Sequence, residues 1–343
     1  MIRTISYVSA LLLLLTGCRG MTEMSPDKPY PCGEIPVQLS VMGTDSPTRS
    51  LQDSSSESDI HDVKVFVIRM NGGEEILDSY YYYGEEPSIT VYINPNKPAD
   101  SYRFVTYVNH SRIDHDSYMK DWADLTDESP DSFQMYGMTE KTVEEIISTP
   151  KVSVGVNRYV SKITVEKITL DWRNPSNSQK DFYITGIYLT DVPGTIAGYR
   201  ELPDDQQKQW YNRNGWMTSE KDDLLHDAVP KTRLDNGQSY SQKHVYYAYI
   251  SDLQTFNTDE NWKKAGTRLI IEADFDGRPC FYHLQINNGT IDPRNKHFVF
   301  EEIVITKPGA ETPYGEYVIE EPITFSVSVN NWTVIKKGTI VID

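Results

Sequence analysis

The sequence lacks a run of basic residues, a second long apolar stretch and any informative cysteine spacing. Its 343 residues include three cysteines, too few and too scattered to indicate a cysteine-based metal site. Lysine and arginine number 33 against 50 aspartate and glutamate residues, so the formal net charge is −17. Because phosphate backbones repel a chain this acidic, its charge argues against nucleic-acid binding. Beyond the N-terminus no apolar stretch reaches the roughly 18 residues that a spanning helix needs.

Catalytic motifs are also missing. The chain has no Gly-x-Ser-x-Gly, His-Glu-x-x-His or Walker-type loop. Its carboxylates are too numerous for a glycosidase pair to be singled out. One polar segment contains the candidate metal ligands His110, Asp114, His115 and Asp116, which an ordinary loop after a strand explains as well. We therefore expect a protein without enzymatic activity, cofactor or metal.

The N-terminus has the pattern of an export signal. A positive charge precedes an apolar run that is too short to cross a bilayer. The run ends in Leu15-Thr16-Gly17-Cys18, which resembles a bacterial lipobox, where cleavage precedes the cysteine and the cysteine is acylated. We expect residues 1–17 to be a signal peptide and Cys18 to carry lipid; a secretory signal with a coincidental cysteine is the alternative. Cys32 and Cys280 then remain, and they could pair in an oxidising compartment or stay free.

Residues 18–49 are expected to form a tether and a first strand that could be removed as a propeptide. In the strand, every second residue is apolar: Ile35, Val37, Leu39 and Val41. This period of two is typical of a half-buried strand. The polar, serine-rich stretch 43–59 follows, and exposed polar loops are where proteases cut. Arg49 and Ser50 lie in that stretch.

The rest of the chain is expected to be all-β. Its 23 tyrosines, with many valines, isoleucines and threonines, favour strands over helices. Short strands separated by frequent turn signals are typical of β-sandwiches. With roughly 150 residues per domain as a guide, we expect two sandwich domains in tandem, over 50–150 and 151–343. A short helix is expected around Lys141–Ile147.

Several local patterns are more specific. Asn71-Gly72-Gly73 and Asp276-Gly277 predict tight hairpin turns. The strand at 63–68 is apolar on both faces and is therefore expected to be central. Residues 191–240 have little periodicity and predict a long excursion that could present Trp210, Tyr211 and Trp216 to a ligand. The run Tyr80–Tyr83 could expose an aromatic pair or pack it under a loop.

The C-terminal tail changes phase. Apolar residues fall on odd positions up to Val329 and on even positions afterwards: Trp332, Val334, Ile340 and Ile342. A shift of one residue turns the apolar face of a strand to the other side. The tail therefore need not continue its own sheet and could project away from it.

Together these stretches resemble the fimbrillin superfamily of type V pili. The lipobox, the loop Thr48-Arg49-Ser50 and the strand Asp62–Ile68 occur in the expected order. Asp131–Met138 resembles a phenylalanine–x–methionine–x–glycine loop. Val156–Ile163 and Ile291–Phe298 resemble two further strand motifs, and the terminal Asn331-Trp332 is also typical.

The resemblance implies transthyretin-like, Greek-key sandwiches and assembly by donor-strand exchange. A palmitate-bearing precursor would reach the cell outer membrane, where an arginine-specific protease would cut between Arg49 and Ser50. The lost strand, Ile35–Val41, would leave a groove that the tail Trp332–Asp343 of another pilin subunit fills, giving a homo- or hetero-polymeric surface fimbrium that supports cell adhesion. The resemblance also admits a pilus anchor that stays lipidated and keeps its first strand. A different reading is an outer-membrane lipoprotein that binds glycan through its aromatic loops.

Overall fold

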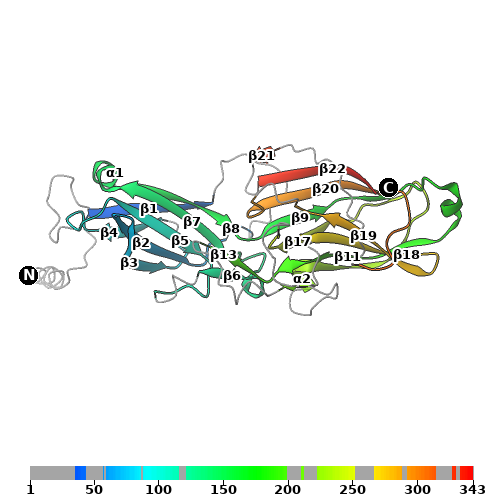
Figure 1. Cartoon of the computed structure of the whole chain (residues 1–343), viewed down its shortest axis with the longest axis horizontal. Helices are drawn as coiled ribbons and strands as arrows, with labels where there is room; N and C mark the ends of the chain where they lie inside the picture. Colours follow the sequence, from blue (N-terminus) through cyan, green and yellow to red (C-terminus); the bar gives the residue numbers. More distant parts are fainter. Residues whose placement is uncertain are drawn as a thin grey trace, which may run out of the picture.

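The fold is elongated and built almost wholly from strands (Figure 1). A computed structural model describes residues 35–43, 57, 59–85, 88–115, 121–198, 210–211, 222–251, 266–287, 292–313, 327–329 and 333–342. The helices among these residues are short: α1 (Val143–Ser148), α2 (Asp222–Leu225) and the 3-10 turns Leu125–Asp127 and Pro175–Gln179. The prediction of an all-β chain is confirmed. None of the described helices has the length and apolar character to cross a membrane.

The sequence-early part forms one seven-stranded sheet, in the order β3-β2-β5-β7-β8-β1-β4. Its strands are β1 (Ile35–Gly43), β2 (Val63–Asn71), β3 (Glu74–Tyr83), β4 (Ser88–Ile93), β5 (Ser101–Val108), β7 (Met135–Thr142) and β8 (Lys151–Arg158). Because β8 completes this sheet, the sheet extends past residue 150. The division into two domains at that point stays a prediction.

Strand β2 is central, as predicted. Val65 and Val67 pack into the same core as β1, whereas Phe66 and Ile68 pack into a smaller cluster on the opposite face. Both faces of β2 are therefore buried. The predicted hairpin between β2 and β3 is confirmed, with positive φ at Gly72 and Gly73.

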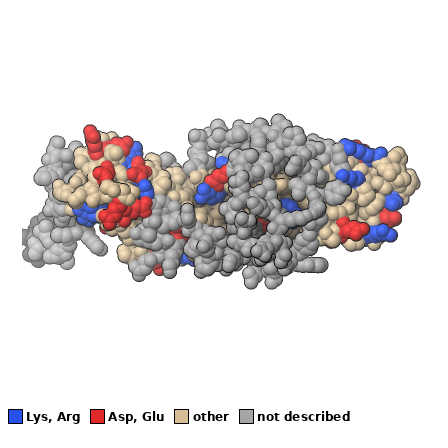
Figure 2. All heavy atoms as spheres, in the orientation of Figure 1, with Lys and Arg blue, Asp and Glu red and all other residues tan. Residues whose placement is uncertain are grey.

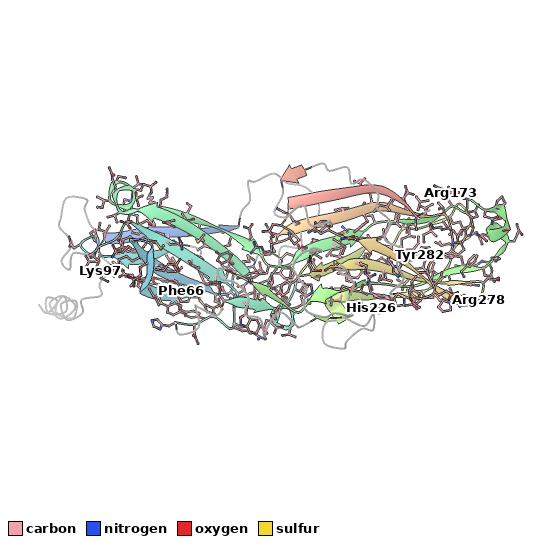
Figure 3. The ribbon with its side chains drawn as sticks, viewed as in Figure 1. Phe66, Lys97, Arg173, His226, Arg278 and Tyr282 are labelled. Atoms are coloured by element: carbon pink, nitrogen blue, oxygen red, sulfur yellow. The ribbon has the colours of Figure 1, made fainter. Side chains whose placement is uncertain are left out.

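The sequence-late part places two larger sheets over a shared core. One contains β16 (Ser239–Tyr240), β10 (Ile168–Leu170), β20 (Lys296–Ile305), β22 (Thr333–Ile342) and β21 (Val327–Val329), with β9 (Ser161–Val165) and β17 (His244–Ala248) joined through β20. The other has the order β15 (His226–Arg233), β11 (Phe182–Thr190), β18 (Arg268–Phe275) and β19 (Arg278–Gln285). Phe182 and Phe300 belong to the same buried cluster, which shows that the sheets pack face to face. Figure 3 shows Tyr282 of β19 in this part of the molecule and Phe66 of β2 in the other.

Two small ribbons complete the fold. Strand β6 (Trp122–Asp124) pairs with β13 (Thr195–Ala197), and β12 (Val192–Pro193) pairs with β14 (Trp210–Tyr211). The helix predicted around Lys141–Ile147 is confirmed as α1, where Thr142 and Glu145 form a capping box.

The segment 191–240 is more regular than predicted. It contains β15, which pairs with β11 at the edge of its sheet. Pro230 and the charged residues of β15 hide its strand character in the sequence, and an edge strand tolerates both. The excursion prediction was therefore wrong for His226–Arg233.

Candidate functional site

The first strand, β1, lies between two strands that hold it on both sides. It pairs antiparallel with β4, from Ile35 opposite Ile93 to Ser40 opposite Ser88. It pairs parallel with β8, from Gln38 opposite Lys151 to Gly43 opposite Val156. The strand predicted to be removable is therefore an interior strand of the sheet (Figure 1).

The side chains of β1 alternate as the sequence predicts. Val37 and Leu39 are fully buried and Val41 is 4% exposed, whereas Gln38 is exposed. Ile35 is partly buried and packs against the same core. Each buried side chain of β1 lies among apolar residues of β4 and β8, including Ile89, Val91, Val152 and Val154. Taking β1 away would thus uncover an apolar groove.

The groove would have two open backbone edges. Among the described residues, β1 is the only ladder partner of β4. The other described neighbour of β8 is β7, whose ladder covers only Arg158 and Asn157. A strand edge with unpaired backbone groups, next to an apolar surface, favours pairing with a strand of another chain.

The predicted cleavage residues, Arg49 and Ser50, lie outside the described residues, as do Cys18, Cys32 and Trp332. The chain is described again at Glu57, shortly before β2. This side chain is buried, 3% exposed, although it carries a carboxylate. The Lys162 ammonium of β9 donates to both carboxylate oxygens, at 2.8 and 3.0 Å.

Two further groups hold Glu57. The Tyr247 hydroxyl of β17 donates to one carboxylate oxygen, and the Arg158 Nε of β8 donates to the Glu57 carbonyl at 3.0 Å. Buried charges are tolerated when they are paired and hydrogen-bonded. Glu57 is therefore an anchor that ties the chain after the predicted cut to β8, β9 and β17.

The predicted donor tail is part of its own sheet. Strand β22 pairs parallel with β20, from Thr333 opposite Lys296 to Ile342 opposite Ile305. Ile342 is buried in the sequence-late core, and Ile340 packs against it. The tail does not project away from its sheet, because β22 is paired with β20 along its length, which buries Ile342 and partly buries Ile340. On its other side β22 meets only β21 among the described residues, so it lies close to the edge.

The candidate metal ligands do not gather into a site where the structure describes them. No group of three or more metal-ligating side chains occurs within the part of the chain that the structure describes. Burial lowers the pKa of His110 to about 3, so its imidazole is neutral between Tyr107 and Tyr159. His115 lies edge-on against Tyr80, and Asp116 lies outside the described residues.

Some of the remaining aromatic and cysteine candidates lie among the described residues, and others lie outside them. The backbone of Trp210 and Tyr211 forms β14, whereas Trp216 lies outside the described residues. Cys280 is buried and has no disulfide partner among the described residues, and burial raises the pKa of its thiol. Its pairing with Cys32 stays untested. In the run Tyr80–Tyr83, Tyr82 is 61% exposed and the other three are partly buried.

A cavity of about 310 Å³ is lined by β7, β8 and the chain that leads into the start of β20. Its charged residues are Asp292, Arg294 and Lys296. Burial alone would raise the pKa of Asp292, but hydrogen bonds from the Arg294 guanidinium, the shortest 2.7 Å, bring it below its usual value. This pairing leaves the cavity without a strong excess of one charge. Where Figure 2 colours the described residues, acidic and basic side chains likewise lie beside one another.

Comparison with known proteins gave matches among solved structures only. No family model and no curated protein matches the chain. A fimbrilin from Porphyromonas gingivalis W83 superposes with a TM-score of 0.53 at 13% identity, over 90% of this chain and 98% of that one. The chain has a fimbrillin-like fold.

Two further structures share the fimbrillin-like fold. A proposed cell adhesion protein from Parabacteroides distasonis has a TM-score of 0.56 at 13% identity, over 84% of this chain and 92% of that one. Another from Bacteroides eggerthii has a TM-score of 0.55 at 15% identity, over 90% of this chain and 99% of that one. The alignments cover 92–99% of the three matched structures, so the similarity extends over nearly the whole of each of those folds.

Three of the motifs that suggested the fimbrillin resemblance, Asp131–Met138, Val156–Ile163 and Ile291–Phe298, meet near one place in the fold. Arg158 donates to the Asn295 side chain at 3.0 Å, which joins two of the motifs. A third motif contributes Gly137, where a Cβ atom would clash with the carbonyl oxygen of Gly155. Gly137 therefore allows β7 to approach β8 closely. In this chain these three motifs build the junction that supports β8, the wall of the groove.

Proposed function

We propose that this protein is a structural, non-enzymatic subunit of a type V surface fimbria that supports adhesion. It would be exported as a lipoprotein acylated at Cys18, held at the outer membrane, and assembled by donor-strand exchange. An arginine-specific protease would cut between Arg49 and Ser50. The tail Trp332–Asp343 of another subunit would then replace β1 between β4 and β8.

The observation that carries this proposal is the position of β1. It is the first described strand of the chain, yet it lies in the interior of the sheet. It supplies buried side chains to the core, and its two backbone edges pair with β4 and β8. Removal of such a strand leaves a groove that a peptide of alternating apolar residues can refill by β-augmentation. Glu57 keeps the chain after the cut fastened to the fold, so that losing β1 need not unravel β2.

The strand β22 fits the role of a donor that is stored before use. It is ten residues long and lies close to a sheet edge, with only β21 beyond it among the described residues. Its pairing with β20 buries Ile342 and partly buries Ile340, which would shield these residues until a neighbouring groove becomes available. Exchange would then transfer a strand between two sheets, with similar backbone pairing in each.

Cleavage at Arg49 is the first prediction. Protein purified from the cell surface is expected to begin at Ser50, and Arg49→Ala is expected to leave the precursor uncut and monomeric. Intact-mass and N-terminal peptide mass spectrometry measure both. The matched control is Arg19→Ala, an arginine on the lipid side of β1, which is expected to process normally.

The opposite result has a defined meaning. Surface protein that keeps acylated Cys18 and β1 would reject the role of polymerising subunit. It would favour an anchor, or a glycan-binding lipoprotein if binding depends on Trp210 or Trp216.

A further inference from the structure

Strand β4 depends on β1 for its backbone pairing. It stands at the end of the strand order, and its ladder with β1 is its only one among the described residues. Strand exchange removes β1 before a new strand arrives. Something other than the ladder must then keep β4 in position, or the groove loses a wall.

Two hydroxyl groups of β3 reach β4. The Tyr92 backbone N–H donates to the Tyr81 hydroxyl at 2.9 Å, and the Tyr83 hydroxyl donates to the Thr90 carbonyl at 2.9 Å. The two tyrosine rings stack, with centroids 6.3 Å apart and an angle of 17° between their planes. Both rings pack against the core that β1 helps to fill. The ends of the seven-strand order, β3 and β4, are thus joined through side chains.

These bonds lie on the side of β4 away from β1. In a strand, the N–H and C=O groups of successive residues point to opposite edges. Thr90 and Tyr92 are two residues apart, so their backbone groups point to the same edge of β4, and there they form hydrogen bonds with the two tyrosine hydroxyls. A ladder with β1 uses the other edge, so the tyrosine bonds do not depend on the presence of β1.

We propose that Tyr81 and Tyr83 form a clasp that holds β4 while the groove is empty, so that a strand from a second copy of the chain can enter. This proposal rests on the proposed function, since it assigns positioning residues to the same groove. The clasp matters little while β1 is in place, because β1 holds β4 by a ladder of six residue pairs. It matters most in the open state.

The double variant Tyr81→Phe/Tyr83→Phe isolates the hydroxyl groups. Both rings stay, so the core contacts and the stack are kept. Two hydrogen bonds of ordinary strength correspond to a change of about five- to hundredfold in an equilibrium constant. The matched control is Tyr82→Phe in the same run, because Tyr82 is 61% exposed on the opposite face of β3, near the Lys64 ammonium.

The test uses the full chain, cut in the loop by an arginine-specific protease in the presence of a labelled peptide of residues 35–43. Fluorescence anisotropy measures the affinity and rate of peptide uptake. The double variant is expected to bind about five- to hundredfold more weakly than the parent, and Tyr82→Phe is expected to match the parent. The thermal midpoint of the uncut double variant is expected to stay close to that of the parent.

Each other outcome overturns a distinct claim. Equal peptide uptake by the double variant and the parent would reject the clasp and leave strand exchange standing. No uptake by the cut parent itself would reject strand exchange, and the clasp with it. If the uncut double variant unfolds, the two hydroxyl groups stabilise the closed protein, and a specific role for them in the open groove is wrong. The single variant Tyr83→Phe then repeats the peptide-uptake comparison with only one hydrogen bond removed.

Discussion

Replacing Lys162 with alanine is expected to lower the free energy of unfolding by about 3–5 kcal/mol, because it leaves a buried carboxylate without its cation. Lys162 and Glu57 have side-chain exposures of 5% and 3%, and their shortest N–O distance is 2.8 Å. The Tyr247 hydroxyl and the Arg158 guanidinium remain, but neither replaces the ammonium at both carboxylate oxygens. Urea denaturation followed by tyrosine and tryptophan fluorescence measures the change.

The chain offers a matched control for this ion pair. Lys167 lies 2.9 Å from Glu302, but the exposures of these side chains are 39% and 24%. An exposed pair contributes about 0–1 kcal/mol, so Lys167→Ala is expected to have little effect. The double variant Lys162→Ala/Glu57→Gln is expected to recover part of the lost stability, since it removes the unpaired charge. Equal effects of Lys162→Ala and Lys167→Ala would contradict the role of Glu57 as an anchor.

The second large effect is expected when β1 is separated from the chain. Its four apolar side chains, at roughly 1.5–3 kcal/mol each, contribute on the order of 6–12 kcal/mol before the costs of association. A chain cut at Arg49 and freed of its N-terminal fragment is therefore expected to form oligomers or aggregates. An excess of the peptide 35–43 is expected to keep it monomeric. Size-exclusion chromatography with light scattering measures the distribution.

Variant peptides separate specific filling of the groove from a general solvent effect. A peptide with Leu39→Asp is expected to lose the protective effect, because Leu39 is fully buried. A peptide with Gln38→Asp carries the same new charge at an exposed position and is expected to retain most of it. A cut chain that stays monomeric without peptide, or equal protection by both variant peptides, would argue against an open groove.

The sequence predicts local structure best where buried and exposed residues follow a regular pattern over a few neighbouring positions. Alternation at Val37 and Leu39 marks β1 because one face of that strand is buried and the other is not. The double-sided pattern around Phe66 marks a central strand because β2 separates two clusters. The turns at Gly72 and Gly277 follow from residues that tolerate positive φ.

It predicts poorly where a residue depends on partners far along the chain. Glu57 stands in a serine-rich stretch and looks like a solvent-exposed charge, but Lys162 and Tyr247 bury it. The tyrosine run shows its role only when β4 is placed beside β3. The phase change before β22 suggests a projecting tail, whereas parallel pairing with β20 accommodates the new phase.

The predicted donor tail also differs from the strand that it would replace. Strand β1 has four apolar residues in unbroken alternation, whereas Lys336 and Gly338 interrupt the series between Val334 and Ile340 in β22. Two separate apolar stretches in the tail are therefore expected to contact the groove. A crosslinking position on the groove wall reports which of them lies beside it.

The most direct measurement places a photocrosslinking amino acid at Ser153 of β8, an exposed position opposite Ser40 of β1. In the uncut precursor, irradiation is expected to link this position to the peptide 35–43 of the same chain. In assembled protein, strand exchange predicts that the same position links instead to residues 332–343 of a neighbouring copy, as identified by mass spectrometry. Assembled protein in which Ser153 still links to residues 35–43 of its own chain would contradict donor-strand exchange.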